Sequence, residues 1–338
     1  MNNPKALCHV LIILVVLTFW PFSGQAQDAV ILPPEQPISG PGGSDLPYDA
    51  VEARRFGTAP DGYWVFRPSG LPVETAPLPI VVFLHGYTQL DPDAYREWID
   101  HIVKGGAFVI FPDYQDEEHL GADFQTIAPD GAAAIRAAID QLVATHQPVD
   151  FDSVTYVGHS MGGILSVVLA DQSLFPMLPP ARAVFSVLPG GCRDCGPTPE
   201  GAGIVVPDPL ALPPTAAVIF MTGDADMVVG ESGAERLWDL TDSVEHRTWI
   251  TVPSDVHGSE PLISDHLLPE TLGPSAKTNA HDHHGTWAVL DMLLACTATG
   301  DSCDTLFQGE PHTIPLGIWS DGTPVNPLEV WPNGPLVS

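Results

Sequence analysis

Near the middle of the chain the sequence reads Ser153-Val154-Thr155-Tyr156-Val157-Gly158-His159-Ser160-Met161-Gly162-Gly163, a β-branched and aromatic run that ends in a serine framed by glycines. Gly158 and Gly162 flank Ser160 in the pattern G-x-S-x-G, in which a tight turn from strand to helix holds a serine in a strained conformation. The apolar residues 164–170 that follow are typical of a buried helix. The local sequence therefore predicts a strand, a turn and a helix with Ser160 as a nucleophile. The alternative is a glycine-rich turn in which Ser160 only hydrogen-bonds backbone.

The ends of the chain differ in composition from its middle. Residues 1–26 combine Lys5, an apolar run over 6–20 and the small residues Gly24 and Ala26, a pattern typical of a cleaved signal peptide. A membrane anchor is the weaker alternative because the run is shorter than the roughly 20 residues that a span needs, and no later segment is long and apolar enough. We expect the mature protein to have no stable membrane span.

The remaining 312 or so residues are expected to form one large domain. Residues 27–50 are rich in proline and glycine and predict an extended leader. The catalytic domain is expected over 51–303. Residues 304–338 are again rich in proline and glycine and are expected to pack on that domain as a tail.

Four cysteines remain once a signal peptide carrying Cys8 is removed, and four cysteines allow three pairings. We favour the two most local disulfides, Cys192 with Cys195 and Cys296 with Cys303. A four-cysteine zinc site and a redox-active C-x-x-C motif are alternatives; an oxidising compartment and the absence of a thioredoxin-like pattern argue against them.

The formal net charge is −30, from 42 acidic and 12 basic residues. Such a charge repels nucleic acid and anionic membranes, so we expect neither as a partner. An acidic, solubilising surface suits a secreted protein.

Apolar runs typical of buried strands alternate with helical patterns, which predicts an α/β fold with a mostly parallel sheet covered by helices on both faces. An antiparallel pair at 51–56 and 63–68 is expected at its edge. Asp130 is expected to cap one helix, and Ser232 with Glu235 to form a capping box at the start of another. The remaining strands are expected at 80–84, 107–111, 153–157, 183–188, 216–222 and 246–252, and the remaining helices at 95–103, 164–170 and 286–294.

Polar residues of complementary chemistry follow three of these strands, and ligands bind such sheets at the carboxyl ends of the strands. Ser160 follows one strand, Asp226 the next but one, and His257 the last. A serine hydroxyl needs a base to take its proton, and the base needs a carboxylate to orient it and to stabilise its charged form. We therefore predict Ser160 as nucleophile, His257 as base and Asp226 as orienting acid. Asp224 is the alternative acid.

The chain order Ser160, Asp226, His257, together with the G-x-S-x-G pattern around Ser160, resembles the α/β-hydrolase superfamily over residues 51–303. Gly86-Tyr87-Thr88 with Gly158-His159-Ser160-Met161-Gly162-Gly163 and a C-terminal cysteine pair is similar to the dienelactone-hydrolase-like and cutinase-like esterases, which include polyester hydrolases. The loop over 253–285 is long for the cutinase-like branch, and Cys192-x-x-Cys195 matches no pattern of either branch.

The resemblance implies an oxyanion hole made by two backbone N–H groups, those of Tyr87 and Met161. The side chains of both residues are then expected to border the acyl group. No cofactor and no metal are required. His281, His283 and His284, which lie before the last predicted helix, are the alternative to His257 as base, and with Asp282 they are an alternative metal-ligand set.

We therefore predict a secreted or periplasmic serine esterase that acts on small-molecule or polymeric esters. A peptidase or amidase with the same residues is one alternative. A catalytically inactive binding module on the same fold is the other.

Overall fold

The computed structural model describes residues 30–72, 74–116, 124–196, 202–272, 276–332 and 334. All helices and strands given below lie in one unit, residues 31–338. The predicted signal peptide, residues 1–26, lies outside the described residues. Within the described ranges no helix is both long and apolar enough to cross a bilayer.

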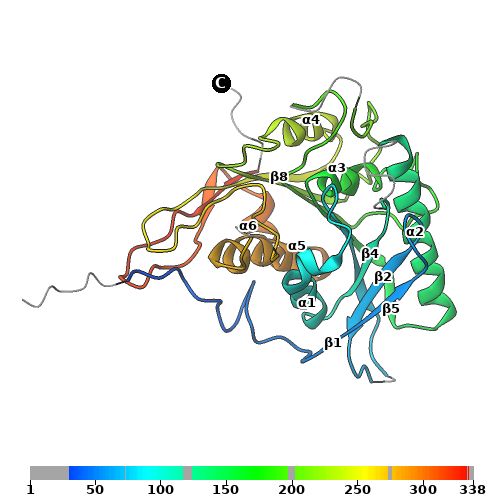
Figure 1. Ribbon diagram of the computed structural model, residues 1–338, viewed down its shortest axis with the longest axis horizontal. Helices are drawn as coiled ribbons and strands as arrows, with labels where there is room; N and C mark the ends of the chain where they lie inside the picture. Colours follow the sequence, from blue (N-terminus) through cyan, green and yellow to red (C-terminus); the bar gives the residue numbers. More distant parts are fainter. Residues whose placement is uncertain are drawn as a thin grey trace, which may run out of the picture. The chain divides into compact units, whose positions relative to one another are not determined.

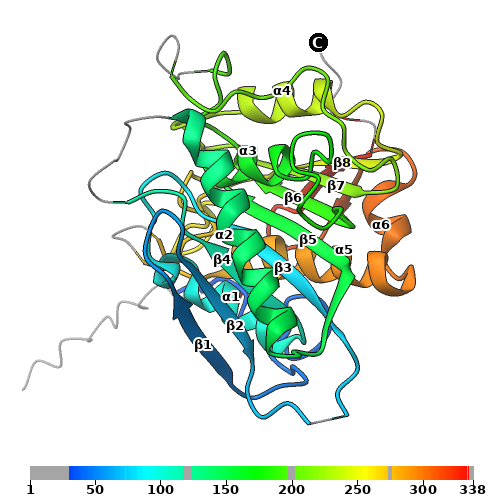
Figure 2. The ribbon, with the colours of Figure 1, turned by 90° about the vertical axis from the view of Figure 1, so that its right-hand side faces the viewer.

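Ten strands form a mixed sheet in the order β1-β2-β4-β3-β5-β6-β7-β8-β10-β9 (Figure 2). The central strands β4, β3, β5, β6, β7 and β8 run parallel to one another, and the outer strands at both edges pair antiparallel. The predicted mostly parallel sheet is thus confirmed. The strands are β1 Val51–Phe56, β2 Tyr63–Pro68, β3 Leu78–Leu84, β4 Phe108–Pro112, β5 Val149–His159, β6 Ala183–Val187, β7 Ala217–Gly223, β8 His246–Val252, β9 His312–Ile314 and β10 Leu328–Trp331.

Helices cover both faces of the sheet (Figures 1 and 2). One face packs on α2 Phe124–Ala144, α3 Met161–Val168 and α4 Ser232–Leu240. The other face packs on α1 Arg96–Lys104, α5 Trp287–Thr299 and α6 Cys303–Phe307. A short 3₁₀ helix, Pro92–Tyr95, precedes α1, and a π-helical turn, His281–Thr286, precedes α5.

Strand β3 shows why its sequence is a continuous apolar run. Ile80, Val82 and Leu84 point into the core on the α2 and α3 side, whereas Val81 and Phe83 point into the core on the α1 and α5 side. Successive side chains of a strand point to opposite faces, so a strand covered on both faces has to be apolar at every position.

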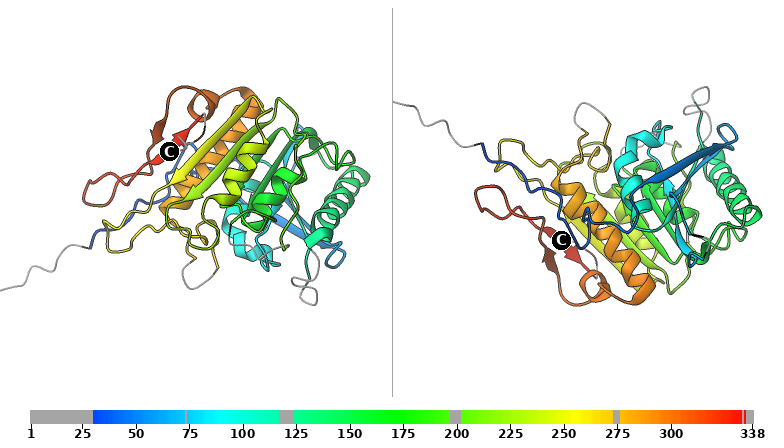
Figure 3. Two further views of the ribbon diagram at one scale, coloured as in Figure 1. Left: turned by 90° about the horizontal axis from the view of Figure 1, so that it is seen from above. Right: turned by 90° about the horizontal axis from the view of Figure 1, so that it is seen from below.

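The tail differs from the expectation that it merely packs on the domain. Its strand β10 pairs with β8, and β9 pairs with β10, so residues 312–331 extend the sheet at one edge (Figure 3). The leader is tied to the rest of the unit in several places. The amide of Gly42, for example, donates to the Asp291 carboxylate at 2.7 Å.

Two predicted helix caps do not form. Helix α2 begins at Phe124, six residues before Asp130, and contains Pro129 within its early turns. Helix α4 begins at Ser232 as predicted, but its N-cap is Glu231 and no side chain caps it. The Ser232 hydroxyl donates to the Val229 carbonyl instead, so the capping box does not form.

The structure joins Cys192 to Cys195 and Cys296 to Cys303, which are the two local pairings that the sequence favours. The second bridge links the end of α5 to the start of α6. The disulfide between Cys192 and Cys195 closes a buried turn that follows β6. In this turn the backbone of Cys192 also pairs with Ile204 as an isolated β-bridge.

Candidate active site

Ser160 lies on the sharp turn between β5 and α3 with φ 56° and ψ −120°, a strained conformation for a residue other than glycine. Its amide donates to the Val187 carbonyl of β6 at 3.0 Å, which fixes the turn on the neighbouring strand. Neither flanking glycine has room for a side chain. A Cβ on Gly158 would collide with the carbonyl of Gly162, and one on Gly162 with the carbonyl of Leu84. The glycines of the G-x-S-x-G pattern are therefore required by close backbone approach.

His266 connects Ser160 with Asp226. Its Nε2 lies 2.9 Å from Ser160 Oγ, and its Nδ1 lies 2.8 Å from Asp226 Oδ2. The three residues follow β5, β7 and β8, so the carboxyl ends of these strands bring together groups that lie up to 106 residues apart in the chain. Asp226 is buried, whereas the ring of His266 keeps some exposed surface.

The carboxylate of Asp226 is held in its charged form. Burial opposes ionisation, but the hydrogen bond and charge of His266 and the amides of Val229 and Val228 outweigh burial and hold the pKa of Asp226 below its ordinary value. The alternative acid, Asp224, instead accepts hydrogen bonds from the amide and hydroxyl of Ser254.

The prediction of His257 as the base is wrong in its placement. His257 Nε2 lies 2.8 Å from Asp321 Oδ2, and its ring contacts the edge of Trp319. Its amide donates to Asp255 Oδ1 in a local turn. His257 therefore belongs to the contact between the loop after β8 and the tail.

A turn that projects from the sheet explains this error. Asp255 and Leu262 pair as an antiparallel bridge, so the chain leaves the sheet after Val252, reverses, and returns before it reaches His266. His257, the first histidine after β8, lies on the outgoing arm of this turn, and His266 follows the returning arm. The turn-forming residues Gly258 and Pro261 are the signal in the sequence that would have indicated such an excursion.

The histidine cluster before α5 lies apart from Ser160. His281 is buried, His283 packs on Trp287 with ring centroids 4.9 Å apart, and His284 Nε2 lies 3.0 Å from the Glu35 carbonyl of the leader. Among the residues that the structure describes, no group of three histidine, cysteine or acidic side chains is arranged to hold a metal ion.

The loop after β3 lies beside Ser160. A Cβ added to Gly86 would lie 3.4 Å from Ser160 Cβ. His85 is buried and stacked on Tyr114 with ring centroids 4.0 Å apart, and burial lowers its pKa to about 4, so it is a neutral packing residue. In the described part of the chain the amide of Tyr87 donates to no carbonyl or side chain. The amide of Met161, in the first position of α3, has no acceptor within the helix.

The two side chains predicted to border the acyl group behave differently. Tyr87 is 41% exposed and stacks on Phe124 with ring centroids 6.0 Å apart. Met161 is buried in the core and lies against Gly191. Only the Tyr87 side chain therefore offers surface to a substrate.

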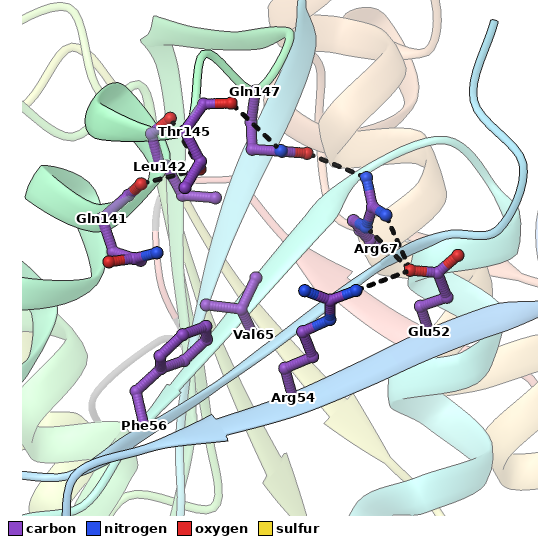
Figure 4. A pocket seen from close by; sticks show the side chains of 9 residues that line it. All are labelled: Glu52, Arg54, Phe56, Val65, Arg67, Gln141, Leu142, Thr145 and Gln147. Carbon is purple, nitrogen blue, oxygen red and sulfur yellow. Dashed lines mark hydrogen bonds and ion pairs between the residues drawn. The ribbon is translucent and has the colours of Figure 1, made fainter.

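A separate hollow of about 80 Å³ lies between β1, β2 and the end of α2 (Figure 4). The Arg67 guanidinium in its lining is paired with the Glu52 carboxylate at 2.7 Å and donates to Gln147 at 3.0 Å. Its lining contains none of Ser160, Asp226 and His266. Because its charges are paired within the chain, this hollow is a structural contact between the edge strands and α2.

The arrangement around Ser160 has the parts needed for proton transfer from a hydroxyl. The imidazole of His266 is within reach of the Ser160 hydroxyl proton, and Asp226 faces the other ring nitrogen, so the tautomer with hydrogen on Nδ1 and a free lone pair on Nε2 is favoured. The Met161 amide directly follows Ser160 in the chain, and the Tyr87 amide belongs to the loop beside it, so both are candidate donors for a developing negative charge.

Residues 79–212 match the family model described as alpha/beta hydrolase fold. The chain has the α/β-hydrolase fold. A solved structure from Klebsiella pneumoniae subsp. pneumoniae, provisionally assigned as a dienelactone hydrolase, matches with 17% sequence identity and a TM-score of 0.48, and the match covers 74% of this chain and 100% of that one. Among curated proteins, none matches this chain in sequence.

Proposed function

We propose that this α/β-hydrolase-fold chain is a secreted serine hydrolase that cleaves carboxylic esters by acyl transfer. The observation that carries the proposal is the placement of His266 between Ser160 Oγ and Asp226 Oδ2. The strained conformation of Ser160 supports the same chemistry, as do the amides of Met161 and Tyr87, which have no acceptor among the residues that the structure describes.

In the proposed reaction Ser160 Oγ attacks the ester carbonyl carbon while His266 Nε2 takes the hydroxyl proton. Asp226 stabilises the resulting imidazolium, and the amides of Tyr87 and Met161 stabilise the oxyanion. When the tetrahedral intermediate collapses, the carbon–oxygen bond to the alcohol breaks and His266 returns its proton to the leaving alcohol. Water, deprotonated by His266, then attacks the acyl carbon, the bond from that carbon to Ser160 Oγ breaks, and His266 returns the proton to Oγ as the acid leaves.

We expect an apolar acyl or alcohol group to contact Tyr87, whose stacked ring is exposed in the loop after β3. The proposal that the enzyme is exported rests on residues 1–26 and is supported by the two disulfides, since such bonds persist in oxidising compartments.

The test compares His266→Ala with His257→Ala, using Ser160→Ala as the reference for loss of the nucleophile. We expect Ser160→Ala and His266→Ala each to lower kcat by about 10⁴-fold or more, because the nucleophile or its proton acceptor is lost. His257→Ala should keep wild-type kcat, since its ring contacts Asp321 and Trp319. The assay is a panel of esters of different acyl length, including a polyester film, with amides in parallel.

A folded Ser160→Ala variant that retains ester hydrolysis would exclude the proposed mechanism. Faster cleavage of amides than of esters would reassign the enzyme as an amidase or peptidase. If His257→Ala lost ester hydrolysis while His266→Ala kept it, the role of base would be assigned to His257.

A further inference from the structure

A buried hydrogen-bonded chain connects the loop after β3 with the segment that carries His266. The amide of Gly86 donates to the hydroxyl of Tyr95 at 3.0 Å, and that hydroxyl lies 2.9 Å from His159 Nδ1. His159 Nε2 in turn lies 2.8 Å from the backbone carbonyl oxygen of His266. We call this chain the Tyr95–His159 bridge.

The direction of each hydrogen bond in the bridge follows from its ends. A carbonyl oxygen only accepts, so His159 Nε2 must carry a proton and Nδ1 must accept the proton of the Tyr95 hydroxyl. The Tyr95 oxygen then has a lone pair for the Gly86 amide. Burial lowers the pKa of His159 to about 3, so its ring stays neutral and keeps one donor and one acceptor.

Further contacts join the same two segments. Gln89 Nε2 donates to the Glu270 carboxyl at 2.9 Å, and the amide of Thr271 donates to the Ala94 carbonyl at 2.8 Å. Residues 266–271 therefore run along residues 86–95, and the Tyr95–His159 bridge is the connection that ends on His266 itself.

We propose that Tyr95 and His159 are positioning residues that hold the loop after β3, which carries the Tyr87 amide, and the base His266 at a fixed separation around Ser160. This inference rests on the proposed acyl transfer, because only that reaction requires the Tyr87 amide and His266 Nε2 to act on one substrate carbonyl. The geometry supports it at Gly86. A Cβ on this residue would lie 3.2 Å from the Tyr95 hydroxyl, 3.3 Å from His159 Nδ1 and 3.4 Å from Ser160 Cβ, so the bridge directly contacts the loop beside the nucleophile.

Three variants cut the bridge at different points. Tyr95→Phe removes the hydroxyl that joins Gly86 to His159. His159→Asn leaves an acceptor near the position of Nδ1 but no donor near Nε2, whereas His159→Gln leaves an amide donor near the position of Nε2. Tyr156→Phe is the matched control, because Tyr156 is also buried and its hydroxyl also donates one hydrogen bond, to the Pro179 carbonyl at 3.0 Å, outside the bridge.

Two rates are measured on the full chain: kcat and KM with a soluble p-nitrophenyl ester, and the rate at which an alkyl fluorophosphonate labels Ser160. Small misplacements of catalytic groups cost up to about 10²-fold in rate. We expect Tyr95→Phe and His159→Asn to lower kcat and the labelling rate by about tenfold or more with KM nearly unchanged. His159→Gln should lie closer to wild type than His159→Asn, and Tyr156→Phe should match wild type.

Wild-type rates in both Tyr95→Phe and His159→Asn would overturn the inference while the proposed function stands. Losses that only follow the fraction of folded protein, measured by circular dichroism, would also overturn it. A wild-type protein that the fluorophosphonate does not label at Ser160 would overturn the proposed function and this inference together.

Discussion

At the level of single residues, two carboxyl groups near Ser160 differ in charge because their surroundings differ. Asp226 is buried but accepts hydrogen bonds from His266 and two amides, which keep it charged. Glu270 is 3% exposed and faces Gln89 and His159, and no lysine or arginine among the described residues forms an ion pair with it. Burial raises the pKa of Glu270 from 4.5 to about 7, although His266 and Gln89 partly oppose the shift. One carboxyl is thus kept as an anion while the other is neutral below neutral pH.

This contrast predicts a pH-dependent effect of Glu270→Gln on stability. Between pH 4.5 and 7 the folded chain retains a proton on Glu270 that the unfolded chain has lost, so folding stability falls as the pH rises through this window. The amide cannot ionise, so the variant should match wild type near pH 4 and exceed it above pH 7, by on the order of 3 kcal/mol at most. Thermal unfolding of both proteins from pH 4 to 9 measures this difference. A difference in Tm that is the same at every pH would contradict it.

At the scale of elements, the turn between β5 and α3 is fixed by backbone contacts that leave no space for a methyl group. A Cβ on Gly162 would meet the carbonyls of Leu84 and His85, and neither backbone group can move without shifting β3 and the loop that follows it. We expect Gly162→Ala to destabilise the fold by about 3 kcal/mol or more. The measurement is the free energy of unfolding in urea.

Gly131→Ala is the control for this substitution. Gly131 lies within α2, and its added Cβ would meet side-chain atoms of Tyr114 and Leu169 at ordinary distances of 3.5 and 3.7 Å. The loss of backbone freedom in the unfolded chain should then stabilise the helix by about 0.5–1 kcal/mol. A Gly162→Ala variant as stable as Gly131→Ala would show that the turn tolerates a side chain.

The elements also show what the sequence alone can predict. β3 and β7 are apolar runs followed by polar residues, and such runs indicate both the strands and the edge where a site forms. The placement of the base depends on where the chain goes after β8. Gly258 and Pro261 indicate a turn after His257, but the contacts with the tail that hold this turn are not visible in the local sequence, so the pattern alone does not show which histidine reaches Ser160. Strands β9 and β10 are short segments of a proline-rich tail and carry no periodic signal.

At the scale of the whole molecule, the tail connects the edge of the sheet with the loop that carries His266. The Trp319 indole donates to Asp255 Oδ2 at 3.2 Å, the Asn326 amide donates to the same oxygen at 2.9 Å, and Gly258 lies against the Trp319 ring. Strand β10 covers the edge of β8, which would otherwise present unpaired backbone groups. The tail therefore stabilises the sheet and supports the loop after β8 at the same time.

Two substitutions in β10 test whether the fold needs the tail. Val330 is fully buried against the α5 side of the sheet, whereas its neighbour Glu329 points to solvent. Val330→Asp places an unpaired charge in that core and should lower the free energy of unfolding by roughly 3 kcal/mol or more. Because the tail also contacts Asp255 and Gly258, ester hydrolysis should be lost at a lower temperature than in wild type. Glu329→Gln changes a neighbouring exposed side chain and should alter stability by less than about 0.5 kcal/mol. Thermal unfolding and residual activity after heating measure both effects, and equal Tm values for the two variants would mean that β10 is dispensable to the folded core.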